Sequence, residues 1–282
     1  MAAKILKVEQ VGPKEWKFER LPGGARLMDK LDDGIDLMEA GNDEEAEKIF
    51  REIIKAFPQH IDARHHLALL MFYRGDLSVA LELWGSAVEI GSQSLPEEFV
   101  MGENRLEWGW LENRPFLRAC HGLGLALFDA GRVEAAHLIY NRLLAMNPND
   151  NQGVRASAIE SAFAMSRPKE VLRICNKYKG DCLADSLYGR PLAFFQLGRK
   201  AQAEKALISA IAMLPLIARE LLKKRHRIPK AMSDGYLTVG GPDEAYEYWQ
   251  RLGKHWKETE GALAFLAEVM SRYQKRPSTK KH

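Results

Sequence analysis

Two pairs of adjacent side chains carry groups that could act as nucleophiles, bases or metal ligands. His65 is followed by His66, and Cys120 is followed by His121. Adjacent residues of a helix point to different faces, so neither pair converges easily on one metal ion or one substrate atom. We interpret these side chains as groove or surface groups. An enzyme is kept as an alternative, with His65, His121 and Arg118 as the residues to test.

Other patterns that carry chemistry are missing from the sequence. Its two glycine pairs are too short for a phosphate-binding loop. The acidic residues Asp32, Asp33, Asp36 and Glu39 cluster within two helical turns, and we interpret them as a solvated face rather than a metal site. The sequence therefore predicts no metal and no cofactor.

The composition narrows the class of protein. The chain has 282 residues, of which 46% are hydrophobic and 28% charged, as in a globular protein. Its 41 basic and 38 acidic side chains give a net charge of +3, which excludes a wholly basic nucleic-acid protein. The mean hydropathy is −0.31, and no apolar run approaches about 18 residues. Three cysteines and no signal-peptide core predict a soluble, cytoplasmic chain with reduced thiols.

A regular spacing of small and aromatic residues is the main signal. Residues of the same kind recur 34 positions apart, in the pairs Gly41 and Gly75, Ala46 and Ala80, and Phe50 and Trp84. The same internal spacing recurs later, in Gly131, Ala136 and Tyr140 and in Gly198, Ala203 and Leu207. A 34-residue period of this kind resembles the tetratricopeptide repeat. The resemblance covers residues 27–217.

Each unit is expected to be a pair of antiparallel helices. In the first unit, Leu27 and Leu31 belong to a helical apolar stripe, and Gly41 suits a left-handed helix end. Ala46 is small where two helices approach, and Phe50 fills the gap between them. One pair cannot bury its apolar faces alone, so stacked neighbours complete the core. The resemblance implies an all-α, right-handed superhelical solenoid.

The organisation of the chain follows from this period. We place units at 27–60, 61–94, 117–150, 151–183 and 184–217, with an insertion at 92–116. The fourth unit is degenerate because Pro168 begins its second helix, and Pro191 should shorten or kink a helix of the fifth. The remaining segments are an extended arm or short extended pair at 1–26, a basic helix and atypical capping helices at 218–274, and a disordered basic tail at 275–282.

The insertion between the second and third units carries unusual residues for a connecting segment. These are Trp108, Trp110, Asn113 and Arg114. One interpretation is that they pin the insertion to the helices by packing and hydrogen bonds. The other is that they help to line a ligand surface, because exposed aromatic and arginine side chains form binding hot spots.

The first helix of each unit lines the concave surface in tetratricopeptide arrays. The residues that we assign to this groove are His65, Leu69, Phe72, Tyr73, Arg118, His121, Leu125, Phe128, Arg155 and Ile159. Arg118 and Arg155 lie one unit apart and suit a carboxylate or an acidic peptide. They can equally pair with local acids such as Glu112 or Glu160.

The near-neutral total charge hides an uneven distribution. Residues 29–55 hold ten acidic and four basic side chains, whereas residues 219–230 hold six basic and one acidic. The basic segment is predicted to be helical, with Lys223, Lys224, Arg225 and Arg227 as an anion-binding set. The two ends could therefore take different partners.

Residues 105–155 show a more specific resemblance. Their blocks WGWLENRPFLRA and MNPNDNQGVR resemble uncharacterised bacterial tetratricopeptide proteins and the suppressor-of-tumorigenicity-seven repeat family. The repeat, together with the missing catalytic set, predicts a non-catalytic scaffold that binds a protein or peptide in its groove. Binding of nucleic acid or an anionic surface through the basic region is an alternative, although nucleic acid is disfavoured. Pairing of two copies through the open solenoid ends is a further hypothesis.

Overall fold

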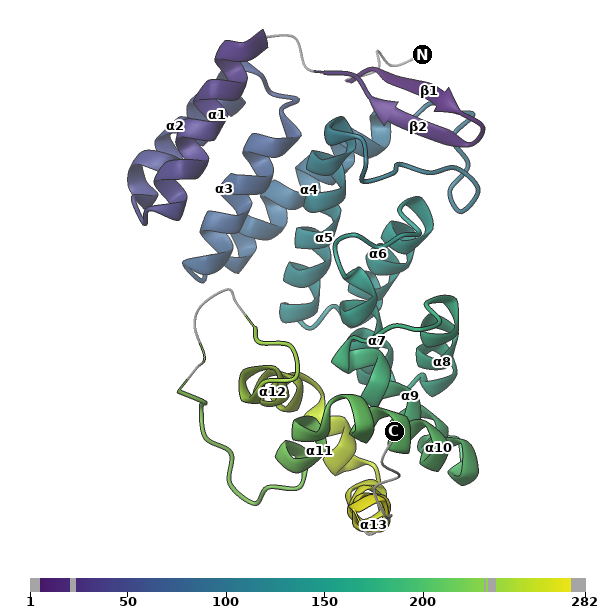
Figure 1. The fold of residues 1–282 in the computed structure, drawn as a ribbon. Coiled ribbons are helices and arrows are strands. Elements are labelled where there is room, and N and C mark those ends of the chain that lie inside the picture. Colours follow the sequence, from purple (N-terminus) through teal and green to yellow (C-terminus); the bar gives the residue numbers. More distant parts are fainter. Residues whose placement is uncertain (1–5, 21–23, 231, 233–236, 275–282) are drawn as a thin grey trace, which may run out of the picture. The chain divides into compact units, whose positions relative to one another are not determined.

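Helices dominate the structure, a computed structural model that describes residues 6–20, 24–230, 232 and 237–274 (Figure 1). The helices are α1 (Gly24–Glu39), α2 (Asp43–Ala56), α3 (Ile61–Tyr73), α4 (Leu77–Ser94), α5 (Arg114–Asp129), α6 (Val133–Met146), α7 (Val154–Ala164), α8 (Pro168–Lys177), α9 (Ala184–Gln196), α10 (Lys200–Met213), α11 (Pro215–Leu221), α12 (Pro242–Glu258) and α13 (Ala262–Gln274). The prediction of an all-α fold is confirmed, with one two-stranded hairpin added. The chain divides into two compact units, 1–157 and 158–282.

Three antiparallel helix pairs build the N-terminal unit: α1 with α2, α3 with α4, and α5 with α6. The turn inside each pair contains a repeat glycine with a positive φ, 78° at Gly41, 88° at Gly75 and 73° at Gly131. Glycine adopts this left-handed conformation without the steric cost of a Cβ atom. The 34-residue spacing of these glycines therefore sets where the first helix of each pair ends.

Close helix contacts in this unit depend on glycines that face aromatic rings. A Cβ atom at Gly122 of α5 would lie 2.3 Å from Cε2 of Trp84 on α4. A Cβ atom at Gly124 would lie 2.4 Å from Cε1 of Tyr140 on α6. Both aromatic side chains are buried. The large residue of each pair thus fills a space that only glycine leaves open on α5.

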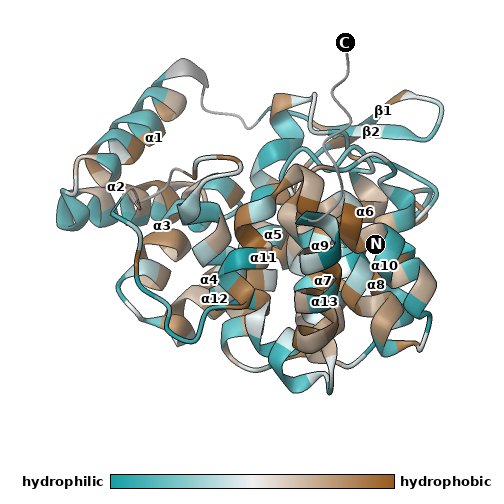
Figure 2. Ribbon diagram, turned by 60° about the horizontal axis from the view of Figure 1, so that its bottom comes forward, coloured by the Kyte–Doolittle hydropathy of each residue, from teal (hydrophilic) through white to brown (hydrophobic). Residues whose placement is uncertain are grey.

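Hydrophilic and hydrophobic residues share the same helices, as expected for elements with one buried face (Figure 2). Within the described part of the chain, no single helix is long and apolar enough to cross a membrane. The pair α10 and α11 passes the same test of length and composition only when both are taken together, with a bend of 111° between them.

The segment before α1 is the extended pair that the sequence left as one of two alternatives. β1 (Val8–Gly12) and β2 (Glu15–Phe18) are antiparallel, and Val8 lies opposite Phe18. Trp16 and Phe18 alternate along β2 and are both buried. The ring of Phe18 packs 5.4 Å from that of Phe116 on α5. The hairpin therefore belongs to the core of the N-terminal unit.

The C-terminal unit contains the pair α9 and α10, and the atypical helices α11, α12 and α13 follow it. Pro191 lies inside α9, which nevertheless has 13 residues, as α3 has. The helix is therefore not shortened, and the alternative, a kink at Pro191, stays a prediction. The helix before this pair, α8, begins at Pro168 and has only 10 residues, against 14 in α6 and in α10.

One arginine ties three helices of the C-terminal unit together. Arg251 of α12 lies 2.8 Å from Glu160 of α7, 2.7 Å from Asp185 of α9 and 3.5 Å from Glu247. Burial raises the pKa of Glu247, while the Arg251 charge opposes that shift. A turn further along α12, His255 stacks on Phe163 with ring centroids 5.5 Å apart.

The basic segment after α10 differs from the prediction. Its helix α11 ends at Leu221, so residues 222–230 are not helical. The buried carboxylate of Glu220 accepts a hydrogen bond from Lys223 and lies 2.9 Å from Nδ1 of His226. The His226 ring stacks 3.7 Å from Trp249 of α12. These tertiary contacts hold the segment against α12 outside a helix. The predicted basic tail, 275–282, lies outside the described residues.

Candidate partner-binding surface

The first helices of two successive pairs, α3 and α5, pack side by side in the N-terminal unit and enclose a small cavity. Its volume is about 140 Å³. Seven of the ten predicted groove residues line it: His65, Leu69, Phe72, Tyr73, Arg118, His121 and Leu125. Trp84, Gly122 and Gln152 complete the lining. We call the surface formed by these ten residues the α3–α5 surface.

Two of the lining residues are fixed by polar partners below the surface. Nη2 of Arg118 lies 2.8 Å from both carboxylate oxygens of Asp62. The indole N–H of Trp84 donates to Nδ1 of His65 across 3.1 Å. Burial lowers the pKa of His65 well below its ordinary value, so its ring is neutral at pH 7. Polar contacts therefore hold the side chains of Arg118 and His65 in place.

Three polar atoms of this surface are buried without a hydrogen-bond partner among the described residues. They are Nε of Arg118, Nε2 of His121 and Oε1 of Gln152. Burial lowers the pKa of His121, against the charge of Asp150, which raises it. A buried donor or acceptor without a partner costs free energy.

Apolar side chains surround these polar atoms. Tyr73 is 76% exposed and Leu125 is 38% exposed. Phe72 packs between Tyr73 and Trp84, with ring centroids 6.2 and 5.6 Å away. The surface thus combines exposed apolar groups with fixed polar groups.

The other three predicted groove residues lie elsewhere. Ile159 is fully buried in the C-terminal unit. A Cβ atom at Gly189 of α9 would lie 3.3 Å from Cγ2 of Ile159. The assignment of Ile159 to a groove was therefore wrong. Arg155 pairs with Asp150 at 2.7 Å. Phe128 is half-buried on α5 and does not line the cavity. Both arginines therefore pair with nearby acids, Arg118 with Asp62 and Arg155 with Asp150.

The insertion residues contact the hairpin and the nearby turn. Nε1 of Trp110 donates to Glu15 at 2.8 Å, and Nε of Arg114 donates to the carbonyl of Trp108 at 3.1 Å. Asn113 is fully buried and bonds the backbone of the hairpin. Through these contacts, Trp110 and Asn113 hold the insertion against the hairpin, and Arg114 joins it to the start of α5.

The predicted anion-binding residues lie at the surface of the C-terminal unit. Lys223 pairs with Glu220, while Lys224, Arg225 and Arg227 are exposed and have no ion pair among the described residues. His226 anchors the segment between them through its stacking on Trp249. Lys224, Arg225 and Arg227 are therefore exposed to solvent on a segment that His226 holds in place.

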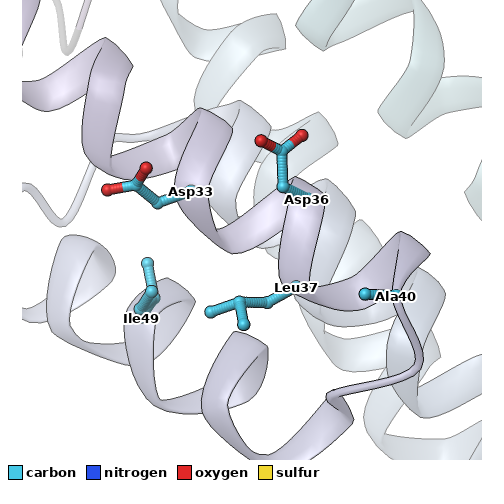
Figure 3. A pocket seen from close by; sticks show the side chains of 5 residues that line it. All are labelled: Asp33, Asp36, Leu37, Ala40 and Ile49. Carbon is cyan, nitrogen blue, oxygen red and sulfur yellow. The ribbon is translucent and has the colours of Figure 1, made fainter.

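The N-terminal unit has further cavities that were not predicted. One, of about 560 Å³, lies where Leu6 and Phe18 of the hairpin segment meet α1, α3 and α5. Because the hairpin contacts were not visible in the sequence, nothing there indicated this cavity. Another, of about 480 Å³, lies between α1 and α2, where Leu37 points toward Ile49 and the Asp36 carboxylate points away (Figure 3).

The acidic cluster of α1 is solvated, as its composition indicated. Asp32, Asp33, Asp36 and Glu39 are all exposed. Among the residues that the structure describes, no three His, Cys, Asp or Glu side chains are grouped so that they could hold a metal ion. Cys120 and Cys175 are buried, and burial raises the pKa of their thiols to about 12 and about 11.

The helix pairs, the repeat glycines and the α3–α5 surface define a tetratricopeptide-like repeat protein. A tetratricopeptide repeat protein from Parabacteroides merdae has a TM-score of 0.53 at 13% identity, over 89% of this chain and 86% of that one. The MamA protein has a TM-score of 0.52 at 16% identity, over 73% and 100%. A putative kinesin light chain of Podosopora anserina, with nearly identical TPR-like repeats, has 0.50 at 15%, over 68% and 96%.

A family match adds to this class. The sequence model of the Tcf25 family, described as transcriptional repressor TCF25, matches residues 36–282. Because the match covers most of the chain, the chain belongs to the Tcf25 family. No curated protein matches it. The tetratricopeptide resemblance is thus confirmed, and the matching family differs from the two groups that residues 105–155 resemble.

Proposed function

We propose that this chain is a non-catalytic scaffold that binds a peptide segment of a protein partner on the α3–α5 surface. The single observation that carries the proposal is the exposure of Tyr73 and Leu125 beside the polar side chains of Arg118, His121 and Gln152, which line the same cavity. A peptide backbone supplies both donors and acceptors, and its side chains supply apolar area. Aromatic and arginine side chains at one site are typical of binding hot spots.

The size of the cavity favours a peptide over a small molecule. Sites for small molecules and cofactors usually enclose about 300–1,000 Å³. The α3–α5 cavity has about 140 Å³, which suits one side chain of a longer segment. The rest of such a segment would lie across the open surface along α3 and α5. The tetratricopeptide-like fold supports this mode, because stacked helix pairs create extended binding surfaces.

The experiment is a peptide-library selection against the whole chain, followed by affinity measurements on the enriched peptides. Tyr73→Ala should weaken their binding by at least about tenfold, because it removes the most exposed aromatic group of the surface. Tyr273→Ala, on α13 of the C-terminal unit, is the matched control. Enriched peptides that bind both variants as tightly as the natural chain, or no enrichment at all, would refute the proposal.

The family description supports a more specific setting. Because the chain belongs to a family described as a transcriptional repressor, we propose that the scaffold acts in transcriptional repression through its bound partner. The chain, fused to a DNA-binding domain, should lower expression of a reporter gene. Tyr73→Ala should relieve this repression, while Tyr273→Ala should not. Equal repression by both variants would show that repression of the reporter gene does not depend on the α3–α5 surface.

A second candidate function is binding of a polyanion by the segment 223–227. The exposure of Lys224, Arg225 and Arg227 on a segment anchored by His226 supports it. Phosphate contacts release counterions, so such binding falls steeply with salt. Reversal of these three charges should abolish binding of single-stranded RNA at low salt. Negligible binding of RNA and DNA by the natural chain at low salt would exclude this function.

A further inference from the structure

The shortened helix α8 leaves a groove on the C-terminal unit. α8 and α10 both pack against α9, but α8 ends at Lys177, about one turn earlier than the 14-residue helices α6 and α10 would imply. The chain then runs through a non-helical segment, 178–183. A cavity of about 610 Å³ lies between this segment and the helices α9 and α10. We call it the α9–α10 groove.

The walls of the groove are regular helix faces. Leu187, Arg190 and Phe194 come from α9, at spacings of three and four residues. The wall from α10 is made by Gln202, Lys205, Ala206, Ser209 and Met213. Met213 is 49% exposed, although it is large and apolar. Two parallel stripes at helical spacing form the kind of trough into which a third helix packs.

The charge of the groove is positive. Lys179, Arg190 and Lys205 line it, and Asp181 is its one acidic lining residue. The Asp181 carboxylate accepts hydrogen bonds from the backbone N–H of Leu183 and from the hydroxyl of Ser186. It is therefore engaged with the N-terminal end of α9. Among the described residues, Lys179 and Lys205 have no ion pair.

The third cation has a structural task. Nη1 of Arg190 donates to Oδ1 of Asn176 at 2.9 Å, and Nη2 donates to the carbonyl of Cys175. Arg190 therefore supplies a hydrogen-bond donor to a backbone carbonyl at the C-terminal end of α8 and holds this end against α9. Because the Arg190 guanidinium is already bonded to α8, the two lysines are the cations left to meet a ligand.

We propose that the α9–α10 groove binds an acidic amphipathic helix of a partner protein. The apolar side chains of that helix pack on Leu187, Phe194 and Met213, and its Asp or Glu side chains meet Lys179 and Lys205. The helix takes the place of the turn that α8 lacks. This site lies in the C-terminal unit and is separate from the α3–α5 surface, so each proposal can fail without the other.

The test is a selection from a library of helical peptides of about 16 residues, long enough to span the groove. The bait is the full chain carrying Tyr73→Ala, which should weaken binding at the α3–α5 surface. The expected winners have apolar residues at spacings of three and four, flanked by Asp or Glu. Their affinity is then measured by fluorescence anisotropy for the bait and for further variants.

Lys205→Glu should weaken the selected peptides at least tenfold, and Met213→Asp should do the same through the apolar wall. Lys257→Glu, the same charge change at an exposed position of α12, should leave their affinity within twofold. Thermal unfolding of each variant shows that the fold is retained. No enrichment, winners without acidic residues, or winners that bind Lys205→Glu unchanged would overturn the proposal. Displacement of the selected acidic peptides by single-stranded RNA would also overturn the proposal and would indicate a polyanion site.

Discussion

The side-chain carbonyl of Asn113 accepts a hydrogen bond from the backbone N–H of Phe18 at 3.1 Å, across 95 residues of sequence. Its amide nitrogen donates to the carbonyls of Trp16 and Glu107, both at 3.1 Å. One fully buried asparagine thus completes the hydrogen bonding of the hairpin edge and of the insertion. An apolar side chain could fill the same space, but it would leave these backbone groups unpaired.

Asn113→Leu should therefore destabilise the N-terminal unit. Two of the three bonds, to Phe18 and Trp16, are buried, and each buried backbone group that loses its partner costs about 1–3 kcal/mol, so the total should be about 2–6 kcal/mol. The measurement is the urea midpoint followed by tryptophan fluorescence. Asn149→Ala is the control, because Asn149 is exposed and its amide donates to the Glu107 carboxylate rather than to a buried backbone group. A midpoint for Asn113→Leu equal to that of the control would contradict this role.

Gly122→Ala tests the close approach of α4 and α5. The added methyl group would overlap the Trp84 ring, so we expect a loss of about 1–3 kcal/mol from overpacking. Gly85→Ala, on α4, is the matched substitution at a helical glycine with no atom within 4 Å of the new Cβ. It should stabilise the chain by about 0.5–1 kcal/mol, because alanine is the better helix former. The two changes should shift the thermal midpoint in opposite directions.

Arg251→Met tests the ion cluster of the C-terminal unit. It leaves the buried carboxylate of Asp185 without its arginine, and loss of one partner of a buried ion pair costs about 3–5 kcal/mol. The matched change is Arg272→Met on α13, whose contacts with Glu204 and Glu268 are exposed. That variant should lose less than about 1 kcal/mol. Similar urea midpoints for both variants would show that the cluster adds no stability.

His255 makes stability depend on pH. Burial lowers its pKa to about 4, against about 6.5 in an unfolded chain. Between these values the unfolded chain binds the proton and the folded chain does not, so stability is full above about pH 6.5 and falls as the pH approaches 4.

His255→Phe keeps a ring against Phe163 but removes this proton. The thermal midpoint of the variant should therefore fall less than that of the natural chain between pH 7 and about pH 5. Equal falls would assign the pH dependence to other groups, such as the buried His65 or His121.

The sequence was sufficient for whatever depends on contacts inside one repeat. The turn glycines, such as Gly41, and the paired small and aromatic residues, such as Ala46 and Phe50, repeat because each helix pair solves the same packing problem. Most of the α3–α5 surface followed from the same register. Ile159 was misplaced because the register says which face a residue occupies within a pair, whereas its burial depends on α9 in the next pair.

Features that depend on distant contacts were missed. The composition of residues 219–230 suits a helix, but α11 ends at Leu221. Beyond it, His226 stacks on Trp249, which follows 23 residues later in the sequence. The groove beside α8 was visible only as a degenerate fourth unit. The free positive charges of the groove are those of Lys179, in the segment 178–183, and Lys205, on α10. No sequence period relates the two residues, so the sequence did not indicate that they line one groove.

The bond between Asn113 and Phe18 also bears on how the N-terminal unit folds. In a repeat array each pair contacts only its neighbours, so folding can begin anywhere and spread along the chain. Here the hairpin and the insertion form one edge that encloses two complete helix pairs in a single loop of sequence. Closing so long a loop costs entropy that is repaid only when both sides are in place. Loss of either side should therefore lower the cooperativity of the whole unit, not only the order of its edge.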